Sequence, residues 1–196
     1  MRNYKLVGLT GGTGSGKSIV REVFSENGYR IIDADTLARK AVESRIVIGS
    51  ILSEFGDDLM TADGLNRREL ANRAFKDSES VKKLNNITHP RITQLFIEEL
   101  KSLVDLGEKK ILFDAPQLFE AGLVIVCDCT VAVLADYELR LERIIKRDSI
   151  SASEAEKRLK IQFPDSFFRE NCDFYIENNN SEKELKKKAS ELVSRI

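Results

Sequence analysis

The sequence predicts an α/β fold in three layers, in which a parallel sheet of about five strands carries helices on both faces. Three observations support this. Short apolar runs alternate along most of the chain with segments whose apolar residues recur at helical spacing. The run at 130–134 is almost wholly apolar, as in a central parallel strand. Near the start, a strand at 6–9 is followed by a glycine-rich turn and a helix.

The glycine-rich turn, residues 11–18, matches the phosphate-binding P-loop pattern G-x-x-x-x-G-K-[ST] without a deviation. A chance match in a chain of this length has a probability on the order of 1%. Glycines allow backbone N–H groups to point inward at a helix N-terminus, where they bind an anion. A flexible turn with an exposed lysine is the weaker alternative, because a strand and a helix flank the motif. The sequence therefore predicts a nucleoside triphosphate site.

Each side chain of the motif has a predicted role. Lys17 reaches the β- and γ-phosphates, and the Ser18 hydroxyl binds Mg²⁺. The predicted nucleotide-binding residues are Gly12, Thr13, Gly14, Ser15, Gly16, Lys17, Ser18 and Ile19.

Composition excludes several other classes of protein. The chain has 196 residues and a net charge of −1, so no overall field attracts it to nucleic acid or to an anionic membrane. No apolar window is long enough to span a bilayer, and the first residues lead directly into a strand. Three cysteines lack zinc-type spacing, and the single histidine excludes a multi-histidine metal site. We expect a soluble cytoplasmic protein.

The second predicted strand, 29–32, ends in Asp33-Ala34-Asp35. Ligands of open α/β sheets lie beyond the carboxyl ends of the strands, where these carboxylates fall. Asp35 can act as the N-cap of the following helix. Asp33 has no comparable structural role, so we interpret it as a functional residue.

Residues 36–104 form a predicted helical insertion without a strong strand. Its arginines, which include Arg67 and Arg68, are either solvated charges or contacts for an anionic substrate. A new helix is expected to begin at Thr88-His89-Pro90, with Thr88 as its cap and Pro90 in its first turn. His89 is equally compatible with a surface role and a functional one.

The strand 110–114 is apolar and ends in Asp114, as in the Walker B pattern, whose carboxylate orders Mg²⁺. After strand 130–134 comes a basic helix, 136–147, which carries Arg140, Arg143 and Arg147. These arginines could be a charged solvent face, paired with nearby glutamates. Beside a P-loop, however, an arginine cluster after a core strand is typical of a lid that closes on phosphates.

The rest of the chain completes this organisation. A last strand at 173–176 precedes a polar run, 177–180, and a C-terminal amphipathic helix. We predict a nucleotide-binding core at 1–35 and 105–196, which contains a lid at about 138–168, and a helical substrate-binding region at 36–104. The guanine-reading Asn-Lys-x-Asp motif of GTPases is missing from the sequence, and the chain is short for a motor or a helicase. A small-molecule kinase fits best.

At this level of detail the chain resembles the dephospho-CoA kinase family, and the resemblance runs nearly end to end. The segments that carry it are 8–18, Ile32-Asp33-Ala34-Asp35, Phe55-Gly56, Asp63-Gly64 with Arg67-Arg68, Leu84-Asn85 with Thr88-His89-Pro90, 114–120, Arg143, Arg147, Gln162 and 173–178. Departures from the family pattern occur at Ile19, Gln117, Arg140, Cys172 and Asn180. None of them removes a group that the chemistry requires.

The resemblance implies ATP-dependent phosphorylation of the ribose 3′-hydroxyl of dephospho-CoA, with Mg²⁺ held by Ser18 and Asp114. It implies that Asp33 accepts the hydroxyl proton and that Lys17, Arg143, Arg147 and also Arg140 stabilise the phosphates. Further implied contacts are Asn178 near adenine and, on the substrate side, Arg67, Arg68, His89, Pro116 and Leu118. The protein is expected to be a monomer or a weak homo-oligomer.

Two alternatives remain at this stage. A nucleoside or nucleotide kinase of the same fold would keep Asp33 and the lid but use another acceptor. A non-catalytic nucleotide-binding protein would be expected to lack Lys17 or Asp33, and both are present.

Overall fold

The computed structural model describes residues 2–196. The chain forms two compact units, one made of the residues up to Asp33 together with Lys101–Ile196, the other of Ala34–Leu100. Within the described residues, no helix is both long and apolar enough to cross a membrane.

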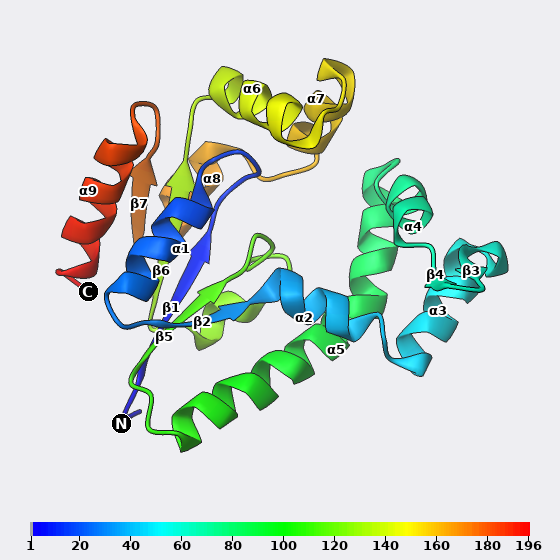
Figure 1. Cartoon of the computed structure of the whole chain (residues 1–196), viewed down its shortest axis with the longest axis horizontal. Helices are drawn as coiled ribbons and strands as arrows, with labels where there is room; N and C mark the ends of the chain where they lie inside the picture. The colour runs from blue at the N-terminus through cyan, green and yellow to red at the C-terminus, as the bar shows by residue number, and fades with distance from the viewer. Residues whose placement is uncertain (1) are drawn as a thin grey trace. The chain divides into compact units, whose positions relative to one another are not determined.

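The first unit is built on a five-stranded, wholly parallel sheet in the order β2-β5-β1-β6-β7 (Figure 1). The strands are β1 (Lys5–Thr10), β2 (Arg30–Asp33), β5 (Lys110–Asp114), β6 (Cys129–Leu134) and β7 (Phe174–Glu177). This arrangement confirms the predicted α/β fold. The strand that leads into the P-loop is the central strand of the sheet.

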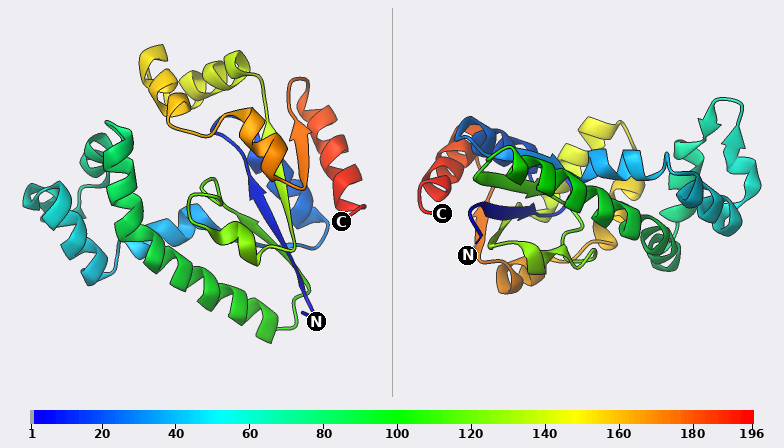
Figure 2. Two further views of the ribbon diagram at one scale, coloured as in Figure 1. Left: turned by 180° about the vertical axis from the view of Figure 1, so that it is seen from behind. Right: turned by 90° about the horizontal axis from the view of Figure 1, so that it is seen from below.

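Residues of β6 alternate between two apolar cores on opposite faces of the sheet. Val131 and Val133 pack with α1 (Lys17–Glu26) and α9 (Glu182–Val193), whereas Ala132 and Leu134 pack with Phe168 of α8 (Asp165–Asn171). Figure 2 shows α8 on the face opposite to α1 and α9. Burial on both faces explains why this strand is apolar at nearly every position.

Two further helices of the first unit lie between β6 and α8. They are α6 (Tyr137–Asp148) and α7 (Ala152–Lys160), and a short 3₁₀ helix, η2 (Leu123–Val126), precedes β6. Figure 1 shows α6 and α7 beyond the carboxyl ends of the strands. This is the edge of the sheet at which ligands bind in open α/β folds.

The second unit is mainly helical. It contains α2 (Ala34–Ala41), α3 (Arg45–Phe55), η1 (Asp57–Leu59), a small hairpin of β3 (Met60–Thr61) and β4 (Gly64–Leu65), α4 (Arg67–Ala74) and most of α5 (Ser78–Asp105). Its core is formed by Val47, Ile51, Leu59 and Leu70. Asp35 was predicted to cap α2, but it lies inside the first turn, where its charge is still favourable.

The prediction that a new helix begins at Thr88 is wrong. α5 runs without a break from Ser78 to Asp105, with Pro90 inside it. Thr88 does not cap a helix; its hydroxyl donates to the carbonyl of Leu84, one turn earlier in the same helix, at 2.9 Å. Pro90 cannot donate the next backbone hydrogen bond, and α5 changes direction partway along its length (Figure 1).

Candidate active site

The P-loop connects the central strand β1 to α1, and its backbone requires glycine at several positions. Gly11, Gly14 and Gly16 have φ values of 129°, 80° and 98°. A side chain at Gly11 would collide with the carbonyl of Val133, and one at Gly16 with the amide of Asn178. These glycines therefore allow both the left-handed turns and the close approach of neighbouring segments.

Three successive carbonyls of the P-loop accept hydrogen bonds from side chains that lie much later in the chain. Arg140 Nε donates to Thr13 at 3.0 Å, Arg143 Nη1 to Gly14 at 3.2 Å, and Asn178 Nδ2 to Ser15 at 2.8 Å. In a trans peptide the C=O and N–H groups point in opposite directions. Holding these three carbonyls fixes the orientation of the peptide groups between residues 13 and 16, while the Thr13 amide donates to Gln162 and the Ser15 amide to the carbonyl of Gly12.

Gln162, which follows α7, contacts the same loop and was not among the predicted site residues. Its Oε1 accepts from the Thr13 amide at 3.0 Å and from Arg140 Nη2 at 2.9 Å. Its Nε2 donates to the Thr13 hydroxyl at 2.7 Å. The only sequence signal for this role was that Gln162 belongs to the segments that resemble the family.

Arg140 supports the back of the P-loop. Its side chain is among the few buried charged groups, with 6% of the residue exposed, and Nη1 pairs with Asp165 at 3.0 Å. Burial lowers the pKa of the Arg140 guanidinium and raises the pKa of the Asp165 carboxyl, while the pairing partly offsets both effects. A side chain at Gly12 would collide with this guanidinium, so the backbone and the arginine pack directly against each other.

The other two arginines of α6 have different surroundings. Arg143 bonds to Gly14 and, through Nη2, to the carbonyl of Asn178 at 3.1 Å. The Arg147 side chain is 61% exposed and forms a two-bond pair with Asp148, with Nε 2.7 Å from Oδ1 and Nη2 3.0 Å from Oδ2. The structure thus brings Arg143 to the P-loop, whereas Arg147 lies at the far end of the helix.

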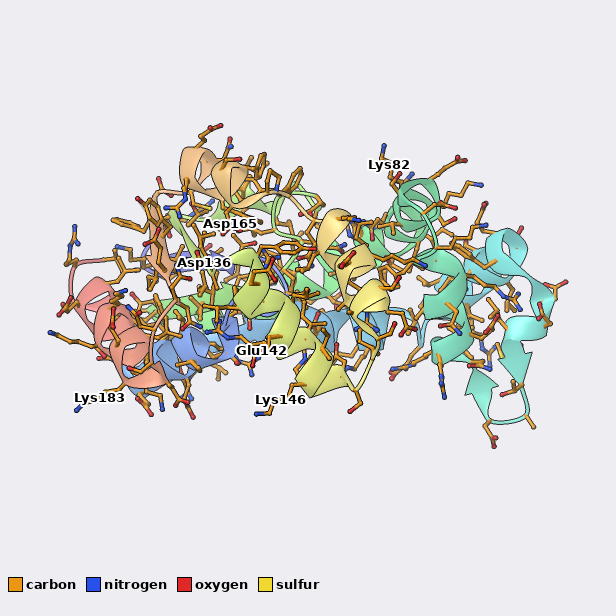
Figure 3. All side chains as sticks on the ribbon, turned by 90° about the horizontal axis from the view of Figure 1, so that it is seen from above. Lys82, Asp136, Glu142, Lys146, Asp165 and Lys183 are labelled. Atoms are coloured by element: carbon orange, nitrogen blue, oxygen red, sulfur yellow. The ribbon has the colours of Figure 1, made fainter. Side chains whose placement is uncertain are left out.

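The opposite face of α6 carries solvent-exposed charges at Glu138, Glu142 and Lys146. Figure 3 labels the side chains of Glu142 and Lys146, and it also labels Asp165, the partner of Arg140. One side of this helix is therefore a charged solvent face, and on the other side Arg140 and Arg143 contact the P-loop. That these arginines act on phosphates stays a prediction.

Two predicted carboxylates lie at the ends of neighbouring strands. Asp33 ends β2 and Asp114 ends β5, and the two are partners in the β2–β5 register. Asp114 is also the register partner of Leu9 on β1, the strand that leads into the P-loop. Lys17 and Ser18 form the first turn of α1 on the other side of that loop. The predicted carboxylates therefore lie at the ends of adjacent strands, and the predicted phosphate-binding and Mg²⁺-binding side chains lie in the first turn of α1.

Arg21 of α1 joins these two carboxylates and was not predicted as a site residue. Its Nη1 lies 3.0 Å from Oδ2 of Asp33 and 3.3 Å from Oδ2 of Asp114. A usable signal was present, since Arg21 lies one helical turn after Lys17 and so shares its side of α1.

Oxygen groups are the ligands that suit Mg²⁺, which prefers one or two carboxylates and keeps several waters or phosphate oxygens. Ser18, Asp114 and Asp33 provide such oxygens. Among residues 2–196 no group of three or more histidine, cysteine or acidic residues could hold a metal ion by itself. This donor set fits an ion that arrives with the phosphates of a nucleotide.

The predicted substrate-side residues fall in both units. In the first unit, the Pro116 carbonyl accepts from the Thr10 hydroxyl at 3.3 Å, and Leu118 is fully buried beside Gly8. Leu118 therefore supports the loop after β5 from within the core. Arg67, Arg68 and His89 belong to the second unit, where both arginines are exposed at the start of α4.

Comparisons with known proteins show which family the chain belongs to. A sequence profile of the family described as dephospho-CoA kinase matches residues 5–184. A dephospho-CoA kinase of Fusobacterium nucleatum is 38% identical over 192 residues, which cover 97% of this chain and 98% of that protein.

Solved structures lead to the same family. A dephospho-CoA kinase from Campylobacter jejuni has a TM-score of 0.71 and 27% identity, with 100% of this chain and 97% of that chain covered. The protein TT1252 from Thermus thermophilus has a TM-score of 0.82 and 29% identity, with 100% and 99% covered. The resemblance noted in the sequence is confirmed: the chain belongs to the dephospho-CoA kinase family.

Proposed function

We propose that the chain transfers the γ-phosphoryl group of ATP to the ribose 3′-hydroxyl of dephospho-CoA, which gives CoA and ADP. Membership of the family supports the reaction. The observation that carries the assignment of roles is the placement of Asp33 and Asp114 at neighbouring strand ends beside the P-loop strand. Phosphoryl transfer depends mainly on in-line positioning and on neutralising charge, and this arrangement offers groups for both.

The donor half of the site is the P-loop with its supports. Loop N–H groups and Lys17 bind the ATP phosphates, and Arg143, already in contact with Gly14, adds positive charge beside them. Arg140, Gln162 and Asn178 keep the loop in shape from behind. Arg147 joins the phosphates when α6 and α7 close over them, and closure also excludes water that would otherwise hydrolyse ATP.

The acceptor half is centred on Asp33. Its carboxylate orients the 3′-hydroxyl and accepts its proton as the bond to phosphorus forms. Ser18 and Asp114 would hold Mg²⁺, which when bound neutralises charge on the β- and γ-phosphates. Pro116, Arg67, Arg68 and His89 are the proposed substrate contacts, and the polar run 177–180, which contains Asn178, is the proposed neighbour of adenine.

The first prediction concerns Asp33. Asp33→Asn keeps the size and polarity of the side chain but removes the base, so kcat should fall about 10²–10⁴-fold while the affinity for ATP stays within about threefold. Turnover is measured as ADP production and affinity by calorimetry. Lys146→Met on the exposed face of α6 is the control and should behave like the wild type. An Asp33→Asn enzyme with full turnover would exclude Asp33 as the base.

The acceptor is tested separately from the mechanism. Wild-type enzyme is incubated with ATP and Mg²⁺ and with dephospho-CoA, adenosine, CMP or no acceptor, and the products are identified by mass spectrometry. The proposal requires that ADP and CoA form when dephospho-CoA is the acceptor. It also requires that adenosine, CMP and the incubation without acceptor give no comparable ADP production. Phosphorylation of adenosine or CMP at a higher kcat/KM would instead indicate a nucleoside or nucleotide kinase.

We also propose a cytoplasmic protein that is a monomer or a weak homo-oligomer. Light scattering coupled to gel filtration, with and without ATP, measures the mass directly. A stable oligomer at micromolar concentration would contradict this part of the proposal.

A further inference from the structure

Arg21 connects three elements of the first unit at the acceptor end of the proposed site. It lies on α1, and its Nη1 is 3.0 Å from Asp33 of β2 and 3.3 Å from Asp114 of β5. The side chain of Asp114 is 10% exposed and that of Asp33 is 32% exposed, so both carboxylates are partly withdrawn from water.

The chemistry of guanidinium explains how one nitrogen serves two carboxylates. Each terminal nitrogen of arginine carries two hydrogens in a fixed plane, so Nη1 can donate one hydrogen to each acceptor. The two carboxylates are register partners on adjacent strands, and like charges at this spacing repel when no cation lies between them. Arg21 supplies the cation and also a defined direction for each bond.

We infer that Arg21 is a positioning residue for phosphoryl transfer: by holding Asp33 and Asp114 together across the ends of β2 and β5, it fixes the orientation of the base toward the acceptor hydroxyl. The inference rests on the proposed role of Asp33 as that base. Arg21 acts through Asp33 and does not itself need to touch the phosphates. This distinguishes it from Lys17 and Arg143, whose proposed targets are the phosphates.

Kinetics of four enzymes test this: wild type, Arg21→Met, Asp33→Asn and the double variant. Arg21→Met should lower kcat about 10–100-fold and leave KM for ATP within about threefold, because the P-loop contacts are untouched. In the Asp33→Asn background the same substitution should change kcat by less than about threefold, because the group that Arg21 orients is already gone. Arg21→Lys keeps the charge without the planar fork and should give an intermediate kcat.

Arg30→Met is the matched control. Arg30 begins β2, the strand that Asp33 ends, and its Nε pairs with Glu108 at 2.7 Å in an exposed ion pair. Removing it deletes an arginine ion pair beside the same two strands but away from the proposed chemistry, so kcat should stay within about twofold of the wild type.

A second measurement does not use the active enzyme. The midpoint of thermal unfolding is recorded without nucleotide for the single and combined variants of Arg21, Asp33 and Asp114. If Arg21 holds two facing carboxylates, Arg21→Met should lower the midpoint clearly in the wild-type background. The same substitution should lower the midpoint of thermal unfolding much less in a protein in which Asp33 and Asp114 are both replaced by asparagine.

Three results would overturn the inference. The first is a wild-type kcat in Arg21→Met together with an impaired Asp33→Asn, which would reject the role of Arg21 alone. Equal fold-losses from Arg21→Met in the wild-type and Asp33→Asn backgrounds would indicate a direct contact with phosphate or a general structural defect. Full turnover in Asp33→Asn would reject the base as well as the residue proposed to orient it.

Discussion

Arg140 is a buried guanidinium whose charge is paired with the carboxylate of Asp165 at 3.0 Å. Arg140 was expected to face the phosphates. In the structure its donors go to Asp165, Gln162 and the carbonyl of Thr13. A buried guanidinium with all these partners fixes the shape of the loop, and it becomes costly if one charged partner is lost.

Removing the charge of Asp165 should therefore destabilise the protein. Asp165→Asn leaves Arg140 buried without a counter-ion, and we expect the free energy of unfolding to fall by about 2 kcal/mol, less than for a wholly buried pair because Asp165 is 30% exposed. Urea unfolding measures this. Glu54→Gln, which breaks an exposed pair with Lys83, is the control and should change the free energy of unfolding far less. A loss for Asp165→Asn no larger than the control would contradict the role assigned to Arg140.

At the scale of elements, the junction of α6 and α7 combines an apolar cluster of Ile144, Ala155 and Leu159 with the carboxylate of Asp148. Asp148 ends α6 and accepts hydrogen bonds from Arg147 and, at 2.7 Å, from Arg158 of α7. The hydrogen bond from Arg147 is the main reason that the pKa of the Asp148 carboxyl lies below its usual value, and the charge of Arg158 adds to the effect. The ion pair thus favours the ionised carboxylate in the folded state.

This predicts a definite pH dependence. A carboxyl group whose pKa is lowered by folding contributes stability above its unfolded pKa of about 3.9, and this contribution is lost as pH falls through the folded value. Asp148→Asn should therefore lower the unfolding midpoint at pH 7. It should also make the decline of the midpoint below about pH 4 less steep than in the wild type. Parallel curves for the two proteins from pH 7 to pH 3 would show that Asp148 does not contribute in this way.

α5 illustrates what local sequence patterns cannot decide. Thr-His-Pro is a typical helix start, and the prediction of a break at Thr88 followed from it. The helix instead continues through Pro90, while the Thr88 hydroxyl bonds within its own helix. Before the proline, Leu84 and Ile87 pack against the core of the second unit, and a pattern in a single sequence does not report such contacts.

At the scale of the whole molecule, much of the candidate site could be predicted from the sequence, because its residues lie directly after strands. The P-loop, Asp33 and Asp114 are each adjacent in sequence to a recognisable strand, and the sheet order then places them together. Arg21 and Gln162 could not be found in that way. Arg21 is one of 31 lysines and arginines; its spacing from Lys17 places it on the same side of α1, but its pairing with Asp33 and Asp114 is seen only in the structure.

The two-unit organisation predicts that a substitution in the second unit can change KM for dephospho-CoA without changing KM for ATP. Arg67 and Arg68 begin α4 in the second unit and are exposed, and the nearest carboxylate given for Arg67 is that of Glu43 at 3.8 Å. Replacing both with methionine should cost little stability. It should raise KM for dephospho-CoA about 3–10-fold and leave KM for ATP within about twofold.

Steady-state kinetics with each substrate varied in turn measure both constants. Lys82→Met, an exposed change in the same unit, is the control and should alter neither KM. An equal rise in both KM values would contradict the assignment of these arginines to the acceptor.

The distant donors that hold the P-loop carbonyls have a consequence for synthesis of the chain. The loop emerges from the ribosome early, but the side chain that binds Ser15 belongs to Asn178, which is 163 positions further along. Arg140 and Arg143 also follow far behind it. A nascent chain therefore carries the complete glycine-rich motif for most of its translation without the groups that shape it. ATP binding should begin only when nearly the whole polypeptide has folded, so an unfinished chain does not sequester nucleotide.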